Sequence, residues 1–195
     1  TGEYILLLNN DTEVITANWM EEMLMYAQRE DVGAVGAKLY YADKTIQHAG
    51  VVIGLGAHHT AGHTHYRIPV QNLGYMGRLC YTQNVTAVTG ACLMTKTALY
   101  REMGGLDEEK FAVAYNDVDY CLKLWQKGLL NVYTPLAQAI HYESRSRGLD
   151  TLSENAKRYE HEKANFYEKY QPYIDNYDPY YNPHFTNKVE NFSLR

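Results

Sequence analysis

Three polar residues near the start of the chain could hold a metal ion or a phosphate. The segment EYILLLNNDTEV places Asn9, Asn10 and Asp11 directly after five apolar residues. Carboxylate and amide oxygens are hard ligands that suit Mg²⁺ or Mn²⁺, and an ion held there could bridge the phosphates of a nucleotide. The stretch NNDT is equally compatible with a polar turn in which Asp11 or Thr12 caps the next helix.

Two acids in the segment AYNDVDYCLKLWQKG could supply a general base. Asp117 and Asp119 are two residues apart, so on a helix their side chains diverge by about 200° and cannot both face one substrate atom. Asn116 suits the N-cap of this helix and Gly128 suits its stop. Acids in a first turn also stabilise the helix through its macrodipole, so helix stabilisation is the alternative role of either acid.

A histidine at the end of the apolar run LAQAI is followed by the basic segment ESRSRG. His141 at a strand end can bind a metal, although a lone histidine is more often structural. Arg145 and Arg147 suit phosphate, because the planar guanidinium donates two parallel hydrogen bonds. The end of this strand is therefore a second candidate site for binding a metal and a phosphate.

Strands alternating with helices must position these clusters. The patterns predict strands over 3–8, 32–36, 46–53, 86–95, 130–134 and 137–142. They predict helices over 17–29, 96–103, 116–127 and 152–170. Thr16 suits the N-cap of the first helix. The unbroken apolar run at 4–8 favours a strand covered on both faces, as in parallel sheets, whose ligands bind beyond the carboxyl ends of the strands.

A long connection over 54–85 is rich in glycine and histidine and lacks periodicity. A loop of this length in a compact domain is usually functional or mobile, so we expect a lid or an acceptor loop. Its histidines match no closed zinc site and have no cysteine nearby, and donors for a polar acceptor explain them equally well. They are His58, His59, His63 and His65.

Composition indicates one main core with an appendage. The chain has 195 residues, 46% of them hydrophobic, which predicts a domain over 1–150 and a charged helix with a tyrosine-rich tail over 151–195. No apolar run approaches the roughly 18 to 20 residues of a membrane span, and no signal peptide is visible, so we expect a cytoplasmic protein. The net charge of −5 without a basic block gives no footprint for nucleic acid. Three widely spaced cysteines argue against a disulfide framework.

The order of the three clusters is more specific than any one of them. The segments LLLNNDTEV, QNVTAVTGACLMTKTALYREMGGLDEEKFAVAYNDVDYCLKLWQKG and AIHYESRSRG resemble family 2 glycosyltransferases of GT-A fold, especially those that build bacterial surface polysaccharides such as rhamnose-containing chains. The resemblance covers about residues 1–150 and implies an α/β fold with a mixed sheet flanked by helices.

The resemblance also implies residue roles. Asn9, Asn10 and Asp11 would occupy the DXD position, with Asp11 the direct ligand of Mn²⁺ or Mg²⁺ and His141 a further ligand. Asp117 would be the catalytic base. The implied acceptor-side residues are Thr89, Gly90, Ala91 and Asn116. The residues implied to bind the leaving diphosphate are Arg145 and Arg147. Amides replace the first acids of the DXD triplet and Asn116 replaces the usual Glu, so the site carries less negative charge than the family pattern.

The implied reaction is an inverting, metal-dependent transfer from a nucleotide-diphosphate sugar to a glycan or lipid-linked acceptor, in the cytoplasm at the inner face of the membrane. Only eight residues precede Asn9, whereas a βαβ unit needs about 30. The resemblance thus implies the C-terminal half of a catalytic domain, inactive alone, without the nucleotide-binding half. We expect a homodimer to cover its sheet edge. The alternative is a noncatalytic carbohydrate-binding or assembly module, whose tyrosine-rich tail and histidine-rich loop bind glycan or a partner.

Overall fold

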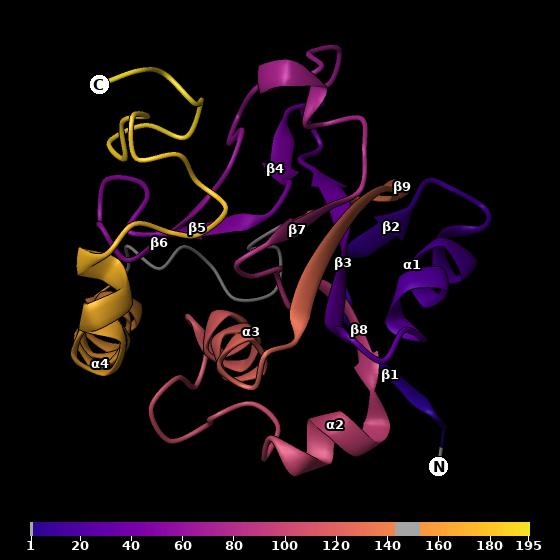
Figure 1. Ribbon diagram of the computed structural model, residues 1–195, viewed down its shortest axis with the longest axis horizontal. Helices are drawn as coiled ribbons and strands as arrows, with labels where there is room; N and C mark the ends of the chain where they lie inside the picture. Colours follow the sequence, from indigo (N-terminus) through magenta and orange to yellow (C-terminus); the bar gives the residue numbers. More distant parts are fainter. Residues whose placement is uncertain (1, 143–152) are drawn as a thin grey trace.

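A central sheet with helices on both faces forms the body of the protein, as the computed structural model in Figure 1 shows. The structure describes residues 2–142 and 153–195. The strands are β1 (Tyr4–Leu8), β2 (Thr12–Val14), β3 (Val32–Tyr40), β4 (Ile46–His48), β5 (Val51–Ile53), β6 (Ala61–His63), β7 (Gln83–Val85), β8 (Cys92–Lys96) and β9 (Leu130–His141). The helices are α1 (Trp19–Ala27), the short 3₁₀ helix η1 (Tyr75–Gly77), α2 (Thr97–Glu102), α3 (Asn116–Gln126) and α4 (Ser153–Asp175).

The sheet is mixed. Its strands lie in the order β1-β8-β3-β9-β2, with β4 beside β3 and β7 beside β9. Strand β3 runs parallel to β9 and antiparallel to β8, while β1 is antiparallel to β8 and β2 is antiparallel to β9. Strands β5 and β6 form a separate pair. The expected fold class, a mixed sheet flanked by helices, is confirmed.

Strand β1 does not occupy the place that its apolar run predicted. It is an antiparallel edge strand rather than a central parallel one, and Leu8 at its end is 42% exposed. The long central strand β3 is buried along all of its length, because it has neighbours on both sides and helices on both faces. Burial by a second copy at the β1 edge stays a prediction.

Several predicted strand boundaries were wrong. The strand expected over 46–53 is divided into β4 and β5, and the strand expected over 86–95 begins only at Cys92. The strands expected over 130–134 and 137–142 are one strand, β9. Its pairing with β3 moves from Ala37 opposite Thr134 to Lys38 opposite Gln138, so Pro135 lies in a bulge. Proline lacks the N–H that a regular ladder needs, and the bulge accommodates it without ending the strand.

The helix caps also differ from the sequence pattern. Helix α1 begins after Asn18, and the Thr16 hydroxyl instead accepts a hydrogen bond from the Gln138 N–H at 3.0 Å. Asn116 is the first helical residue of α3, while the cap position belongs to Tyr115 with φ 66°. Gly128, with φ 85°, follows the end of α3 and confirms the predicted stop.

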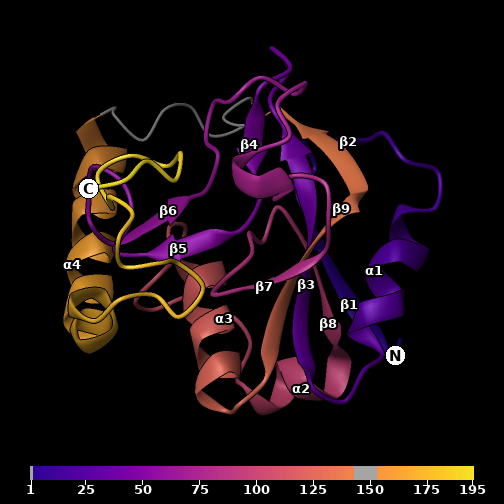
Figure 2. The same ribbon diagram turned by 45° about the horizontal axis from the view of Figure 1, so that its top comes forward.

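The two faces of the sheet carry different helices. Met23 and Ala27 of α1 pack with Val35 of β3 on one face. Val118 and Leu122 of α3 belong to the core cluster on the other face. Figure 2 shows α3 and α4 together on the side of the sheet opposite α1.

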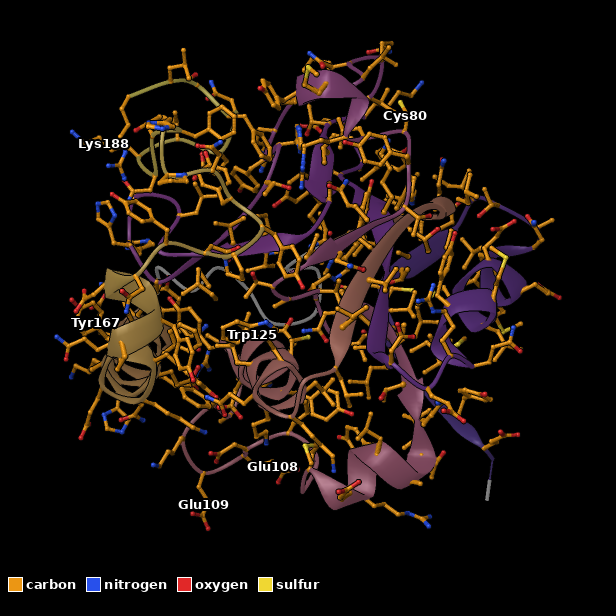
Figure 3. The ribbon with its side chains drawn as sticks, in the orientation of Figure 1. Cys80, Glu108, Glu109, Trp125, Tyr167 and Lys188 are labelled. Carbon is orange, nitrogen blue, oxygen red and sulfur yellow. The ribbon has the colours of Figure 1, made fainter. Side chains whose placement is uncertain are left out.

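Helix α4 shares the core of the sheet domain. Phe166 is fully buried and Tyr170 is 1% exposed, both in the cluster that contains α3. Each such aromatic side chain contributes about 1.5–3 kcal/mol of hydrophobic free energy. Figure 3 shows Trp125 on the side of α3 that faces α4, where its ring meets the ring of Tyr173 edge-on at 5.3 Å. The helix therefore stabilises the position of α3.

The segment over 54–85 is more ordered than an irregular lid. It contains β6, η1 and β7, and Thr60, Thr64 and His65 are buried. The Thr64 hydroxyl donates to the Ala49 carbonyl at 2.8 Å, which fastens the segment to the strand region before it. Three free cysteines, Cys80, Cys92 and Cys121, agree with the absence of a disulfide framework. In the part of the chain that the structure describes, we find no helix long and apolar enough to cross a membrane.

Candidate active site

The turn after β1 and the end of β9 bring two predicted ligands together. Strand β2 pairs with β9 so that Thr12 lies opposite His141. The His141 Nε2 atom is 3.1 Å from Asp11 Oδ1 and 3.0 Å from Asn9 Nδ2. Residues about 130 positions apart thus meet at one edge of the sheet, whereas Asn10 is exposed in the turn.

A glutamine on β4 orients the His141 ring. Gln47 Oε1 lies 2.8 Å from His141 Nδ1, and the Gln47 amide nitrogen donates to the His141 carbonyl at 3.5 Å. This second bond assigns the oxygen of Gln47 to the ring, so His141 Nδ1 carries the hydrogen. The Nε2 lone pair then faces Asn9 and Asp11, the tautomer that a metal-binding histidine needs.

These side chains fit a divalent ion that is shared with a substrate. The His141 Nε2 atom and the Asp11 Oδ1 atom are 3.1 Å apart, a spacing at which both can bind one cation. Among the residues of the described ranges, no group of three or more His, Cys, Asp or Glu is placed to hold a metal. Asp11 and His141 fit the way in which Mg²⁺ is held, by one or two protein ligands, water and substrate phosphates.

Asp117 lies at the start of α3 with its carboxylate held by the backbone. The Gly90 N–H donates to Oδ2 at 2.7 Å and the Val118 N–H donates to Oδ1 at 2.8 Å. A Cβ atom on residue 90 would lie 3.2 Å from the Asp117 Cβ, so glycine permits this close approach. The carboxylate is thereby fixed in one orientation.

The TGAC segment joins the two clusters. Ala91 accepts a hydrogen bond from the Asn9 N–H at 3.0 Å through its carbonyl, while Gly90 contacts Asp117. Thr89, Gly90, Ala91 and Asn116 all line the same hollow as Asp117. The structure thus brings the predicted acceptor-side residues to the candidate base. Arg145 and Arg147 lie outside the described residues.

Asp119 faces away from this hollow. It is fully buried, and its Oδ1 accepts hydrogen bonds from Lys169 Nζ and the Tyr170 hydroxyl, both at 2.6 Å. Lys123 Nζ lies 3.3 Å from Oδ2. Burial and the hydrogen bond to Asp119 raise the pKa of Tyr170. Asp119 therefore holds cationic neighbours and links α3 to α4, and the two acids diverge as their spacing on the helix predicted.

Helix α4 supplies supporting residues that the sequence interpretation missed. Glu162, which is 2% exposed, accepts hydrogen bonds from the N–H groups of Val113 at 3.3 Å and Ala114 at 2.6 Å. These bonds hold the loop that leads into Asp117. Its spacing was the available clue: Glu162 precedes Phe166 and Tyr170 by four and eight residues, so it lies on the apolar stripe of the helix.

Tyr115 stiffens the same loop. Its ring stacks on Phe166 with centroids 4.7 Å apart, and its hydroxyl is 3.0 Å from both the Thr60 and Tyr159 hydroxyls. Its φ of 66° is rare for a bulky residue, and these contacts hold it there. The contacts with Phe166, Thr60 and Tyr159 consequently hold the backbone turn before Asn116 in place.

Two adjoining hollows form the candidate cleft. The larger, of about 590 Å³, is lined by Asn9 and Asp117, and the smaller, of about 400 Å³, by Tyr41 and Tyr66. Both volumes lie in the range of small-molecule sites. The residues that line both hollows are Ala61, His63, Thr89, His141 and Tyr159. The cleft therefore has two lobes that meet beside the two histidines.

Comparison with known proteins indicates the class of protein to which this chain is similar. No family model matches the chain. It is 45% identical over 99% of its length to the uncharacterized protein y4gI of Sinorhizobium fredii (strain NBRC 101917 / NGR234), and 38% identical over its full length to the O-antigen biosynthesis protein RfbC of Myxococcus xanthus. The chain spans 21% and 15% of the lengths of these two relatives.

A third relative and a solved structure carry more explicit names. Over 66 residues, which are 34% of its length, the present chain is 35% identical to an N-acetylglucosaminyl-diphospho-decaprenol L-rhamnosyltransferase of Mycobacterium tuberculosis (strain ATCC 25618 / H37Rv). The aligned part covers 21% of that protein. The crystal structure of GalNAc-T7 with UDP, GalNAc and Mn²⁺ aligns with a TM-score of 0.57 and 14% identity, over 81% of this chain and 30% of that one.

The structural likeness shows a GT-A fold. Together with the relatives, it confirms the resemblance found in the three motifs. In sequence, the chain is similar to glycosyltransferases of the family 2 type that build polysaccharides, and in fold it is similar to a GT-A glycosyltransferase.

Proposed function

We propose that the chain is the metal- and acceptor-binding part of an inverting glycosyltransferase. The enzyme would move a sugar from a nucleotide-diphosphate donor to a glycan or lipid-linked acceptor in bacterial surface polysaccharide synthesis. One observation carries the proposal: Asp117 lines the same hollow as Asn9 and His141, although these residues come from three separate elements. A base and a diphosphate-binding group would then face one substrate space.

Asp117 is proposed to remove the proton from the acceptor hydroxyl as that oxygen attacks the anomeric carbon. The backbone N–H groups of Gly90 and Val118 hold the carboxylate in place, and its remaining lone pairs are available to the substrate. A base fixed in this way loses little orientational freedom when the acceptor binds.

Asp11 and His141 are proposed to hold Mn²⁺ or Mg²⁺, which would offset the charge that develops on the leaving diphosphate. Gln47 keeps the His141 lone pair available, and Asn9 would contact the same diphosphate. Arg145 and Arg147 are proposed to bind it too. Separate groups would thus serve the acceptor and the leaving group.

Three further expectations, on domain division, oligomeric state and location, remain part of the proposal. They are a division into 1–150 and 151–195, a homodimer, and a place in the cytoplasm at the inner membrane face. Only the last draws on a relative, whose name includes a decaprenol-linked substrate. A noncatalytic glycan-binding module is the competing proposal, and the aromatic lining of the smaller hollow supports it. Turnover of a nucleotide-sugar by the intact protein separates the two.

The base assignment is tested by Asp117→Asn in the intact protein. The change keeps the size of the side chain and one oxygen, but it removes the basic group, so we expect the transfer rate to fall by about 10² to 10⁴. Steady-state kinetics with donor and acceptor varied separately would measure it.

The matched control is Asp119→Asn on the same helix. Because Asp119 contacts Lys169 and Tyr170 instead of the hollow, its loss should appear mainly as a lower melting temperature. A near-normal rate for Asp117→Asn would remove that residue from the base role.

A further inference from the structure

Two histidines form a hydrogen-bonded pair, and one of them, His63, lies at the boundary between the two lobes. His48 ends β4 and is fully buried, while His63 ends β6 and is half-buried. Their Nδ1 atoms are 2.9 Å apart, and their rings meet edge-to-face with centroids 5.0 Å apart. Two nitrogens this close must share a proton, so one donates and the other accepts.

The backbone decides which nitrogen of His48 carries the proton. The Thr89 N–H donates to His48 Nε2 at 3.4 Å, so Nε2 is an acceptor. Burial lowers the pKa of His48 well below its ordinary value, which keeps the ring neutral at pH 7. A neutral imidazole with an unprotonated Nε2 carries its hydrogen on Nδ1. His48 therefore donates to His63.

This donation fixes the tautomer of His63. Its Nδ1 accepts from His48, so the hydrogen of the neutral ring lies on Nε2. A metal at Nε2 would require the hydrogen on Nδ1, directly opposite the His48 Nδ1–H. His141 has the reverse arrangement, because Gln47 accepts its Nδ1–H. The cleft thus presents one imidazole suited to a metal and one suited to an oxygen acceptor.

The surroundings of His63 match a sugar better than a phosphate. His63 lines both lobes, so it lies between the lobe of Asp117 and the smaller lobe. The smaller lobe is lined by the rings of Tyr41, Tyr66 and Tyr159. Aromatic faces pack against the apolar faces of sugar rings, and a neutral N–H can bind a hydroxyl without the cost of burying a charge.

We infer that His63 Nε2–H donates a hydrogen bond to a sugar oxygen of an acceptor that extends from Asp117 in the larger lobe into the smaller lobe, and that His48 is the positioning residue that holds His63 in this tautomer. The inference rests on the proposed function, since it assigns the acceptor side of the same cleft. It makes His63 a binding residue and leaves the metal to the side of His141.

The first test reads the tautomers directly and needs no turnover. In the ¹⁵N-histidine-labelled chain, long-range ¹H–¹⁵N correlation spectra should show the hydrogen of His48 on Nδ1 and that of His63 on Nε2. Methyl glycosides of glucose, galactose, mannose, rhamnose and N-acetylglucosamine serve as probes. At least one should shift the His63 Nε2 resonance and leave that of the exposed His59 unchanged. The opposite tautomer at His63, or no shift with any probe, overturns the inference.

The second test compares two amides at position 63 in the intact protein. Glutamine can place an N–H₂ group near the Nε2 position, whereas asparagine reaches only the Nδ1 position. We expect His63→Asn to raise the acceptor KM by about tenfold, the effect of one lost hydrogen bond. The acceptor KM of His63→Gln should lie between those of His63→Asn and the unmodified protein, and the donor KM should change in neither.

Equal acceptor KM values for the two variants, or a matching rise in the donor KM, would contradict the inference. His59→Gln is the exposed control. The two proposals fail separately: normal turnover of Asp117→Asn removes the base and leaves the histidine tautomers intact. A reversed His63 tautomer removes the acceptor contact and leaves Asp117 untouched.

Discussion

Two acids of one helix show how the packing of single residues separates roles that their chemistry does not. Asp117 and Asp119 both occupy the first turn of α3. Gly90 lies against the first and donates its N–H to it, which leaves the carboxylate at a hollow. Lys169 and Tyr170 enclose the second. A carboxylate that cations and a hydroxyl surround is a structural link, and one at a cleft can act on a substrate.

At this residue scale, Gly90→Ala should disturb catalysis more than folding. The new methyl group would lie 3.2 Å from the Asp117 Cβ, so the carboxylate must move by a few tenths of an ångström. Because small displacements of a reacting group are costly, we expect the rate to fall by about 10- to 100-fold. Kinetics together with a thermal melt would measure both effects.

A double mutant tests whether the Gly90 effect acts through Asp117. If it does, Gly90→Ala should lower the rate of the Asp117→Asn protein far less than that of the unmodified protein, since contacting residues are not additive. The same factor in both backgrounds would show that Gly90 acts by another route.

At the scale of elements, local patterns predicted the helices better than the arrangement of the sheet. Helix α3 was expected over 116–127 and is found over 116–126, because its apolar stripe and the stop at Gly128 are local features. The edge position of β1 depends on pairing with β8, about 90 residues away, which an apolar run cannot encode. The His48–His63 pair likewise depends on how β4 and β6 are arranged in space, which no local pattern encodes.

In the candidate site, too, residues with a local sequence signal were predicted and residues placed by long-range contacts were not. The strand-end residues Asn9, Asp11 and His141 were found from their types and positions, and the structure brings them together. Glu162 was missed, because a glutamate in a charged helix resembles a surface residue until its backbone partners are known. Tertiary hydrogen bonds, rather than residue type, give it its place.

Helix α4 should therefore influence the cleft through Glu162. In Glu162→Gln the amide N–H₂ faces a backbone N–H, so at least one of the Val113 and Ala114 N–H groups loses its acceptor. We expect a loss of about 1–3 kcal/mol in unfolding free energy, together with a slower transfer rate. Urea unfolding and kinetics would report the two effects.

The control is Glu160→Gln, two residues earlier on the same helix. Glu160 pairs with Lys163 on the surface, and such a pair contributes about 0–1 kcal/mol. If both variants unfold alike, the backbone clamp assigned to Glu162 is wrong.

At the scale of the whole molecule, buried histidines make the fold sensitive to acid. Burial lowers the pKa of His48 well below its ordinary value and lowers that of His65 to about 4. His65 Nε2 accepts a hydrogen bond from the Tyr75 N–H at 3.3 Å, which a protonated ring would lose. Asp178 opposes this trend. Burial raises its pKa, so the folded chain binds this proton more readily than the unfolded chain and gains stability as the pH falls.

The free energy of unfolding should consequently decrease as the pH falls from 6.5 towards 4. In this window the unfolded chain binds protons at histidines that the folded chain keeps neutral, so each buried histidine contributes up to about 1.4 kcal/mol per pH unit. For His65, whose pKa is about 4 in the fold, the total approaches roughly 3 kcal/mol. Urea unfolding at successive pH values should therefore show a shallower pH slope for His65→Gln than for the unmodified chain, whatever the absolute stability of the variant. His184→Gln, at an exposed position, should keep the original slope, and equal slopes in all three proteins would exclude His65 as a source of the acid sensitivity.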